Sequence, residues 1–456
     1  DKLYFLGIFY EVRLLGSSIF SRIVPLRIIL ITAIVAAVIM GDSMLYNVLP
    51  AQTGAFGISV ASVGVLLSAN RIVRLISNSI APYIIRRFGI YIPLYACVAI
   101  SIGTTITYGS TDIFFILLAS RLLWGMCYSI FRLVGFITVL ENSYDDIRGR
   151  CMGVFDGGGR SGGVIGVLFG GLLFDLYGRG ISFFVIGMLG ALGFPLVFLL
   201  RRNASNLVVT EGTQKHKSVG TNETENEFNV LEQRSWYVKF VEILIAYTPE
   251  LNKRDQFKIL VCNTTYFTYH LVMNGVLVST LGLFMFMRLG DGWFFMGILI
   301  GVATVNGMIL GLRWISGLSA PFLGYFGDKI GRERILVIST PICVISLLLL
   351  ALPIPTWISI TWLPLTFLAT IAATTSLDAM VGGLAPVNRR ANVMSRYATW
   401  QDLGSAIGPI VAFGILTFTS LSTIYFLGAA LLSVAIISLV LVSSFAIPNH
   451  RGLRRN

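Results

Sequence analysis

Long apolar segments recur through the whole chain, and each is long enough to cross a lipid bilayer. A membrane-spanning helix needs about 20 mostly apolar residues. Twelve segments meet this requirement, and most connections between them are short, so neighbouring helices are expected to run antiparallel. The segments are 24–48, 59–84, 90–110, 112–139, 151–177, 181–200, 257–287, 294–325, 334–353, 356–383, 391–419 and 421–446. The sequence therefore predicts an all-α polytopic membrane protein with 12 transmembrane helices.

The composition also indicates an integral membrane protein. Hydrophobic residues make up 55% of the 456 residues and charged residues only 12%, whereas soluble domains carry about 25% charged residues. The net charge is +12, but the basic residues form short clusters between apolar segments and do not gather in one patch. We therefore expect a lipid bilayer around the protein and no nucleic-acid partner.

Cysteine and histidine residues show no spacing typical of a metal site. The three histidines are scattered, and the five cysteines lie in or beside apolar segments, which favours buried free thiols. No convergent nucleophile or nucleotide-binding loop is present either. We expect no metal, no cofactor and no enzymatic activity.

Polar stretches divide the chain into parts. We predict an N-terminal lead at 1–23, a first bundle at 24–200, a linker at 201–256, a second bundle at 257–446 and a tail at 447–456. The linker is polar and reads as disordered, except for the apolar, aromatic stretch 236–247. That stretch is either an amphipathic helix lying on the membrane surface or a chance apolar patch.

The distribution of lysine and arginine predicts the orientation of the chain. Cytoplasmic loops are enriched in these residues. If the N-terminus lies inside, inner loops and tails hold 26 of the 34 basic residues, and outer loops hold only Arg179 and Arg288. We therefore expect both termini on the cytoplasmic side of a membrane, most simply a prokaryotic inner membrane.

The two halves of the chain repeat each other. The pattern R-x-I-S-x-x-x-A-P begins at Arg74 in the second predicted span and again at Arg313 in the eighth, 239 positions later. Glycines 162 and 166 in the fifth span correspond to glycines 404 and 408 in the eleventh, 242 positions later. The similar offsets predict two pseudo-symmetric six-helix bundles with a substrate site at the membrane midplane.

The loop between the eighth and ninth spans carries the most specific motif. It reads Gly324-Tyr-Phe-Gly-Asp328-Lys329-Ile-Gly331-Arg332. This sequence resembles the gate motif G-x-x-x-D-[RK]-x-G-[RK] of the major facilitator superfamily, and the resemblance extends over the whole chain. It implies secondary transport, with the acidic side chain pairing or capping when the inner gate closes.

The corresponding loop in the first half departs from this motif. Arg86 stands where the family usually has its acid, which puts the gate of the first half in doubt. The fourth span carries Arg121-Leu-Leu-Trp124-Gly125, similar to the R-x-x-x-G element that the family associates with proton coupling. The glycine run from Gly162 to Gly171 resembles an exporter-associated element, with plain helix packing as the alternative.

Ionisable residues inside the predicted spans are the first candidates for function, because burying a charge in lipid is expensive. The candidates chosen from them are Asp42, Arg71, Arg74, Arg121, Arg132, Asp156, Arg160, Arg313, Asp378 and Asp402. At about 1.5 Å per residue, Asp42 and Arg121 lie at similar depth. We predict that they form a proton-coupling pair, with a static salt bridge as the alternative.

The other candidates divide into a substrate cavity and gates. Arg160 and Asp402 occupy repeat-equivalent positions and are predicted to face a cavity, although Asp156 is placed to pair locally with Arg160. The predicted cavity residues are Arg132, Arg160, Asp402, Gln401, His270, Trp124 and Tyr46. The predicted gate residues are Gly324, Asp328, Lys329, Arg332, Arg86, Asp156, Asp378, Arg313 and Arg74.

These features predict a monomeric secondary transporter that moves a small organic solute by alternating access, coupled to protons. The excess of arginine favours an anionic or amphipathic solute, and the glycine element favours export. The alternatives are uptake of an organic anion or a metal-chelate, siderophore-type solute, and a receptor or assembly factor with a transporter fold that transports nothing.

Overall fold

The computed structural model describes residues 24–143, 147–208, 252–295, 297–386 and 390–444. The predicted lead 1–23, the stretch 236–247 and the tail 447–456 lie outside these residues. The predicted linker overlaps the described part only at its ends, where 201–208 and 253–256 are helical.

Helices make up the described first half. They are α2 (Leu26–Ala51), the 3₁₀ turn η1 (Thr53–Phe56), α3 (Val60–Phe88), α4 (Tyr91–Ser110), α5 (Phe114–Asn142), α6 (Arg148–Gly190) and α7 (Gly193–Val208). Gly178 interrupts α6 with φ +73°, a backbone conformation that favours glycine. The fifth and sixth predicted spans meet at this break.

The second half is also helical, with one exception. Its elements are α10 (Lys253–Tyr269), the π-helix η2 (His270–Leu277), α11 (Val278–Leu289), β1 (Gly292–Phe295), β2 (Ile298–Gly301), α12 (Val302–Ser316), the 3₁₀ turn η3 (Gly317–Ser319), α13 (Ala320–Ile330), α14 (Arg332–Ala351), α15 (Thr356–Leu384), α16 (Arg390–Leu416) and α17 (Leu421–Ser444).

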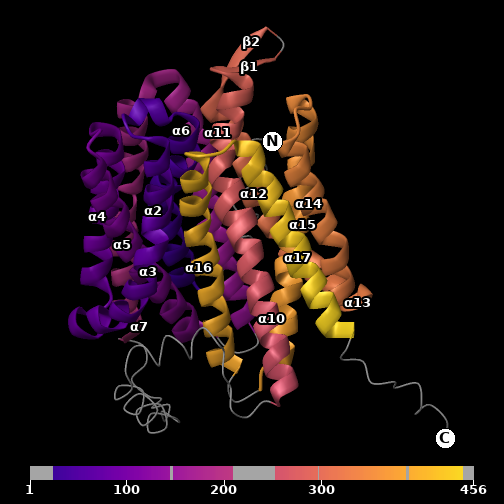
Figure 1. The fold of residues 1–456 in the computed structure, drawn as a ribbon. Helices are drawn as coiled ribbons and strands as arrows, with labels where there is room; N and C mark the ends of the chain where they lie inside the picture. The colour runs from indigo at the N-terminus through magenta and orange to yellow at the C-terminus, as the bar shows by residue number, and fades with distance from the viewer. Residues whose placement is uncertain (1–23, 144–146, 209–251, 296, 387–389, 445–456) are drawn as a thin grey trace, which may run out of the picture. The chain divides into compact units, whose positions relative to one another are not determined.

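The prediction of a continuous helix over 294–325 is wrong at both ends. Residues 292–301 form an antiparallel hairpin in which Gly292 pairs with Gly301, and the hairpin projects beyond α11 and α12 (Figure 1). Gly290 and Gly297 have positive φ angles, so glycines bend the chain where apolar content alone predicted a helix. At the other end, η3 separates α12 from α13.

The predicted all-α polytopic fold is confirmed. Within the described residues, nine helical stretches are long and apolar enough to cross a bilayer, and one of them, Arg150–Asn203, contains two predicted spans. The eighth predicted span is divided by η3, and the eleventh carries Arg396, Gln401 and Asp402 within α16.

The chain packs into two compact units. The first contains the chain up to Leu207 together with Leu281–Ile315, and the second contains Val208–Thr280 and the chain from Ser316 onward. Residues 281–315 therefore pack with the first unit although they follow the predicted linker. The boundaries at 24–200, 201–256 and 257–446 remain a prediction from the sequence.

A glycine face joins α6 to α2 in the first unit. A Cβ atom on Gly166 would lie 2.8 Å from the Cα of Met40, and one on Gly162 would lie 2.6 Å from the Cα of Ala36. Only glycine permits this backbone approach. The glycine run that resembles an exporter element is thus a helix-packing surface.

The repeat-equivalent glycines play the same part in the second unit. A Cβ atom on Gly404 would lie 3.0 Å from the backbone nitrogen of Leu271, and Gly408 packs against Gly275 of η2. The first unit pairs its first and fifth spans, and the second unit pairs its seventh and eleventh. The sequence repeat is therefore also a repeat of helix contacts.

We predict that Gly166→Ala destabilises the protein by about 1–3 kcal/mol, because the new methyl group has no space beside Met40. Gly153→Ala on the same helix is the matched control, since a Cβ atom there meets nothing within 4 Å. Thermal unfolding in detergent measures both variants. Equal melting temperatures would contradict the packing role of Gly166.

Candidate functional site

Asp42 of α2 and Arg121 of α5 form a buried ion pair. The guanidinium Nη1 of Arg121 donates to Oδ1 of Asp42, and the side chain of Arg121 has no exposed surface. Arg121 Nε also donates to the backbone oxygen of Leu66 at 2.9 Å. The structure thus brings together the two residues that the sequence placed at similar depth, while their role in coupling stays a prediction.

Two further side chains complete this cluster. Asn70 of α3 donates from Nδ2 to Oδ1 of Asp42 at 3.1 Å. The hydroxyl of Tyr46 donates to the backbone oxygen of Leu67 at 2.6 Å, and its ring lies 5.0 Å from the guanidinium carbon of Arg121. Side chains of two helices, α3 and α5, therefore hold Asp42 in place, and the carboxylate accepts from two donors. We name Asp42, Arg121, Asn70 and Tyr46 the carboxylate cluster.

More arginines surround the carboxylate cluster within the first unit. The guanidinium of Arg71 lies 5.2 Å from the Tyr46 ring. Arg313 of α12 interacts electrostatically with Arg71, Arg160 and Tyr46. The first unit thus places positive charge from α3 and α12 near Tyr46, and Arg160 of α6 interacts with the α12 arginine.

The remaining candidates of the first unit occupy varied surroundings. Arg74 donates to the backbone oxygen of Asn70 at 3.2 Å, and its guanidinium lies over the ring of Tyr128. Trp124 is buried and stacks on the same Tyr128 ring, at a centroid distance of 5.4 Å. The repeat-related arginine Arg74 therefore anchors α3 to its aromatic neighbour on α5.

Asp156 lies among basic residues, as the sequence suggested. Its carboxylate interacts electrostatically with Arg160 on the same helix and with Arg132 of α5. Arg132 also lies over the ring of Phe136, 5.4 Å from the centroid. The predicted facing of Arg160 and Asp402 stays a prediction, because Arg160 belongs to the first unit and Asp402 to the second.

Polar and aromatic side chains gather between α10, η2, α15 and α16 in the second unit. Tyr266 stacks on Tyr397 at 4.0 Å and donates its hydroxyl to Gln401 at 3.1 Å. The carboxylate of Asp378 interacts with both phenol groups. Asp378, which the sequence assigned to a gate, thus lies in the same group as the cavity candidate Gln401.

His270 belongs to the same region. It begins the π-helix η2, a rare element that often marks functional sites. Its Nδ1 lies 2.9 Å from the amide nitrogen of Asn274 and 3.4 Å from the hydroxyl of Ser405. The imidazole is therefore held by neighbours on η2 and α16.

The gate motif is organised around Arg332. Its Nη2 donates to Oδ1 of Asp328 at 2.8 Å, and its Nη1 donates to the backbone oxygen of Ala379 at 2.5 Å. Gly331 lies between α13 and α14 with φ +107°, which explains a glycine at this motif position. The acid of the motif pairs with the arginine of the same motif, and that arginine ties the loop to α15.

Other gate candidates lie at the surface. Lys329 is exposed at the end of α13, and Arg86 is exposed at the end of α3. Gly324 faces α15, where a Cβ atom would lie 3.5 Å from Thr375. Arg86 precedes Gly89, whose φ of +72° repeats the turn seen at Gly331, so the turn is shared by both halves although the acid is not.

Several buried polar residues of the first unit were not predicted from the sequence. Asn70 binds Asp42 directly, and Asn47, Asn306 and Asp175 join three helices through hydrogen bonds. The three asparagines carry no charge and so escaped a search for buried ions, whereas Asp175 carries a charge but lies near the end of its predicted span. The rarity of asparagine in apolar segments was the available signal.

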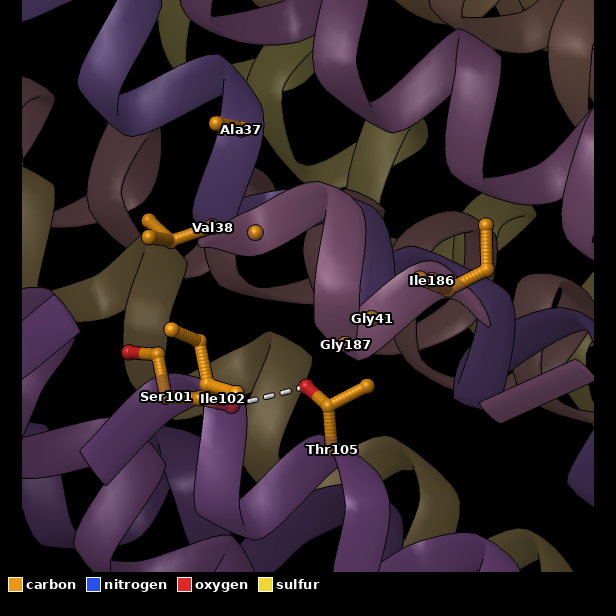
Figure 2. A pocket seen from close by; sticks show the side chains of 9 residues that line it. Ala37, Val38, Gly41, Ser101, Ile102, Thr105, Ile186 and Gly187 are labelled. Carbon is orange, nitrogen blue, oxygen red and sulfur yellow. Dashed lines mark hydrogen bonds between the residues drawn. The ribbon is translucent and has the colours of Figure 1, made fainter. Parts of the chain in front are cut away.

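A crevice lies close to Asp42 but does not suit a substrate. It is an open space of about 170 Å³ between α2, α4 and α6, lined by residues such as Gly41, Ser101, Ile102 and Thr105 (Figure 2). Its walls leave no room for a water-sized molecule, so it offers no room for a solute. The hydroxyl of Thr105 already donates to the backbone oxygen of Ser101 at 2.8 Å. The crevice is therefore a gap in helix packing.

Comparison with known proteins identifies the family. The sequence pattern described as Major Facilitator Superfamily matches residues 31–317 and 311–455. The chain belongs to the major facilitator superfamily. This is a family of multi-pass membrane transporters, and the family membership agrees with the sequence-based prediction.

Curated relatives match parts of this chain. The human "Chromaffin granule amine transporter" is 28% identical over 142 residues, which cover 31% of this chain and 27% of the relative. The "Multidrug resistance protein MdtG" of Salmonella typhimurium is 26% identical over 272 residues, covering 59% of this chain and 57% of the relative. The matches therefore span about a quarter and just over half of these relatives.

Solved structures share the fold. The nucleoside transporter NupG superposes with a TM-score of 0.67 at 13% identity, covering 91% of this chain and 99% of that one. A POT family transporter in complex with a thioalcohol-conjugated peptide gives a TM-score of 0.68, also at 13% identity, and covers 92% of this chain and 96% of that one. These similarities show the transporter fold alone.

We predict that Arg121→Ala destabilises the protein by about 3–5 kcal/mol, because the substitution leaves Asp42 buried without its cation. The double variant Asp42→Asn/Arg121→Gln should recover much of this loss, since neither residue then carries a charge. Thermal unfolding in detergent provides the measurement.

Asp328→Asn serves as the control for this series. It removes the charge of an ion pair whose side chains are 39% and 65% exposed and leaves the bond from Arg332 to Ala379 in place, so it should cost at most about 1 kcal/mol. If Arg121→Ala were as mild as Asp328→Asn, the buried pair would not be a major stabilising contact.

Proposed function

We propose that this protein is a proton-coupled antiporter that exports a small, amphipathic organic solute by alternating access. The observation that carries the proposal is the buried pair of Asp42 and Arg121. A carboxylate inside a membrane span, held by a guanidinium and an amide, can bind a proton, and the guanidinium then loses its ionised partner.

The physical basis of coupling is the change of charge on Asp42. While Asp42 is ionised, it compensates Arg121, which has no exposed surface. Once Asp42 binds a proton, Arg121 keeps its charge and loses its partner, and an uncompensated buried charge is strongly unfavourable. The cluster must then rearrange, and a rearrangement that differs between conformations shifts their populations.

Other observations support the organic solute and the direction. The names of the relatives include a multidrug resistance protein and amine transporters, which favours an amphipathic solute and movement out of the cytoplasm. The bacterial relative, together with the lysine and arginine distribution, supports an inner membrane with both termini cytoplasmic. We also propose that one chain suffices for transport, because both halves of the repeat are present.

Positive charge in the first unit favours a second candidate, an organic anion as the solute. Arg313 interacts electrostatically with Arg71 and with Arg160, and arginine binds carboxylate and phosphate groups well. Reconstituted protein can be offered ethidium as an amphipathic cation and salicylate as an aromatic anion. Flux of salicylate without flux of ethidium would favour the second candidate.

We predict that Asp42→Asn abolishes solute flux driven by a pH gradient. Asparagine is close in size but cannot bind and release a proton. The measurement uses proteoliposomes containing trapped pyranine, which report proton movement when ethidium or another solute of a small library is added.

Asp112→Asn is the matched control. Asp112 also pairs with an arginine, Arg179, but its side chain is 71% exposed, against 11% for Asp42. This variant should retain flux. Coupled flux in Asp42→Asn equal to that of the parent protein would overturn the coupling assignment, and a parent protein that carries no solute under any gradient would favour a receptor or assembly role.

A further inference from the structure

Two buried asparagines tie three helices together in the first unit. Asn47 of α2 donates from Nδ2 to the backbone oxygens of Val167 in α6 and Ala303 in α12, both at 2.9 Å. Asn306 of α12 donates from Nδ2 to Oδ1 of Asn47 at 2.8 Å and to its backbone oxygen at 3.0 Å. Neither asparagine has exposed surface.

A carboxylate strengthens the same junction. Oδ2 of Asp175 in α6 accepts from the backbone nitrogen of Thr304 at 2.7 Å and from its hydroxyl at 2.6 Å. Thr304 is the third residue of α12, where backbone N–H groups lack partners within the helix. Asp175 therefore caps α12 from another helix and places its negative charge at the favourable end of the helix dipole.

Glycines bring the backbones close enough for these bonds. A Cβ atom on Gly171 of α6 would lie 2.6 Å from the backbone oxygen of Ala303 and 2.7 Å from Nδ2 of Asn47. One on Gly307 of α12 would lie 2.9 Å from the same Nδ2. Larger side chains at either position would separate the helices and break the amide contacts.

The segment held by these contacts is residues 281–315, which pack with the first unit although the chain on both sides belongs to the second. We define the latch as Asn47, Asn306 and Asp175. The latch lies at the end of α2, just before Ala51, which is the outer end of the helix in the predicted orientation. It thus fastens α12 to α2 and α6 on the outer side.

We propose that this latch closes the outer end of the transporter and opens once in every transport cycle. The inference rests on the proposed function in one respect, since it assumes alternating access. It names the hydrogen bonds that must break when residues 281–315 separate from α2 and α6.

One unpaired acceptor in the latch favours its opening. Within the described part of the chain, the buried Oδ1 of Asn306 has no hydrogen-bond partner. Leaving a buried acceptor unpaired is unfavourable, whereas water would reach that oxygen after opening. The closed state is therefore stabilised by four hydrogen bonds from side-chain amides but contains one unsatisfied acceptor. That acceptor limits the free-energy difference between the closed and the open state.

The latch is also placed to respond to the carboxylate cluster. Asn47 follows Asp42 by five residues on α2, which is about 7–8 Å along the helix axis. A shift of α2 that follows protonation of Asp42 would move Asn47 with it, because a helix transmits displacement along its axis. The proton site and the latch would thus share one rigid element.

Hydrogen–deuterium exchange of the full chain in lipid nanodiscs tests whether the contacts hold the closed state. Asn306→Asp keeps the shape of the side chain but sets a carboxylate against two oxygens of Asn47. We expect exchange in peptides covering 302–310 to become at least tenfold faster. Asp175→Asn, a milder change that removes the charge at Thr304, should have the same direction.

Asn263→Asp is the matched control for these variants. Asn263 is 1% exposed and lies in α10 of the second unit, so its replacement adds the same buried carboxylate away from the latch. It should leave exchange at 302–310 unchanged. Unchanged exchange in both latch variants would overturn the proposal, whether or not a transported solute is known.

A reversible crosslink tests whether the latch must open. Asn47→Cys/Asn306→Cys can be joined by a short bis-methanethiosulfonate reagent, and the five native cysteines are buried. With ethidium as the probe, the crosslink should stop flux, and reductant should restore it, while the single-cysteine variants keep their flux under the same treatment. Ethidium flux in the crosslinked protein equal to that before crosslinking would contradict the proposal.

The two arms separate this inference from the proposed function. Faster exchange in Asn306→Asp together with no flux in the unmodified protein would support the latch contacts and count against transport of the probes. Normal flux that survives the crosslink would support transport and refute the latch.

Discussion

The close contact between α2 and α6 is the constraint on which the rest of the first unit depends. No water is available in a bilayer core, so helices associate through tight packing and shared polar contacts. The glycines of α6 let its backbone reach that of α2 at Ala36 and Met40. This approach fixes the height and rotation of α2, which carries both Asp42 and Asn47.

Two kinds of polar contact then act on α2. Asp42 binds an arginine and an asparagine, so its contact contains charge. Asn47 binds backbone oxygens and another amide, so its contact is neutral and depends on geometry alone. We infer that the first contact senses the proton and the second holds the conformation.

The sequence predicted the parts of the structure that depend on apolar length and charge. The helical architecture, the internal repeat and the meeting of Asp42 with Arg121 follow from hydropathy, offsets and depth along straight helices. The hairpin at 292–301 did not follow, since its apolar residues resemble a span and only its glycines indicate a bend. The partners of Asp328 were also out of reach, because a side chain that pairs within its own loop depends on the local turn at Gly331.

Asn70, Asn47 and Asn306 were missed for a related reason. A buried amide gains its value from partners on other helices, and the rotation of those helices is set by packing, which one sequence does not reveal. The repeat gave no help, since the two latch asparagines stand 259 positions apart, unlike the offset of about 240 positions that relates the halves.

The π-helix η2 has a consequence for the helical phase of the seventh span. A π-turn holds more residues than an α-turn, so the eight residues from His270 to Leu277 advance less around the axis than eight α-helical residues would. The side chains that follow are therefore rotated relative to those that precede. With this rotation, α10 packs against α15, α16 and α17, and the span from Leu281 onward packs within the first unit.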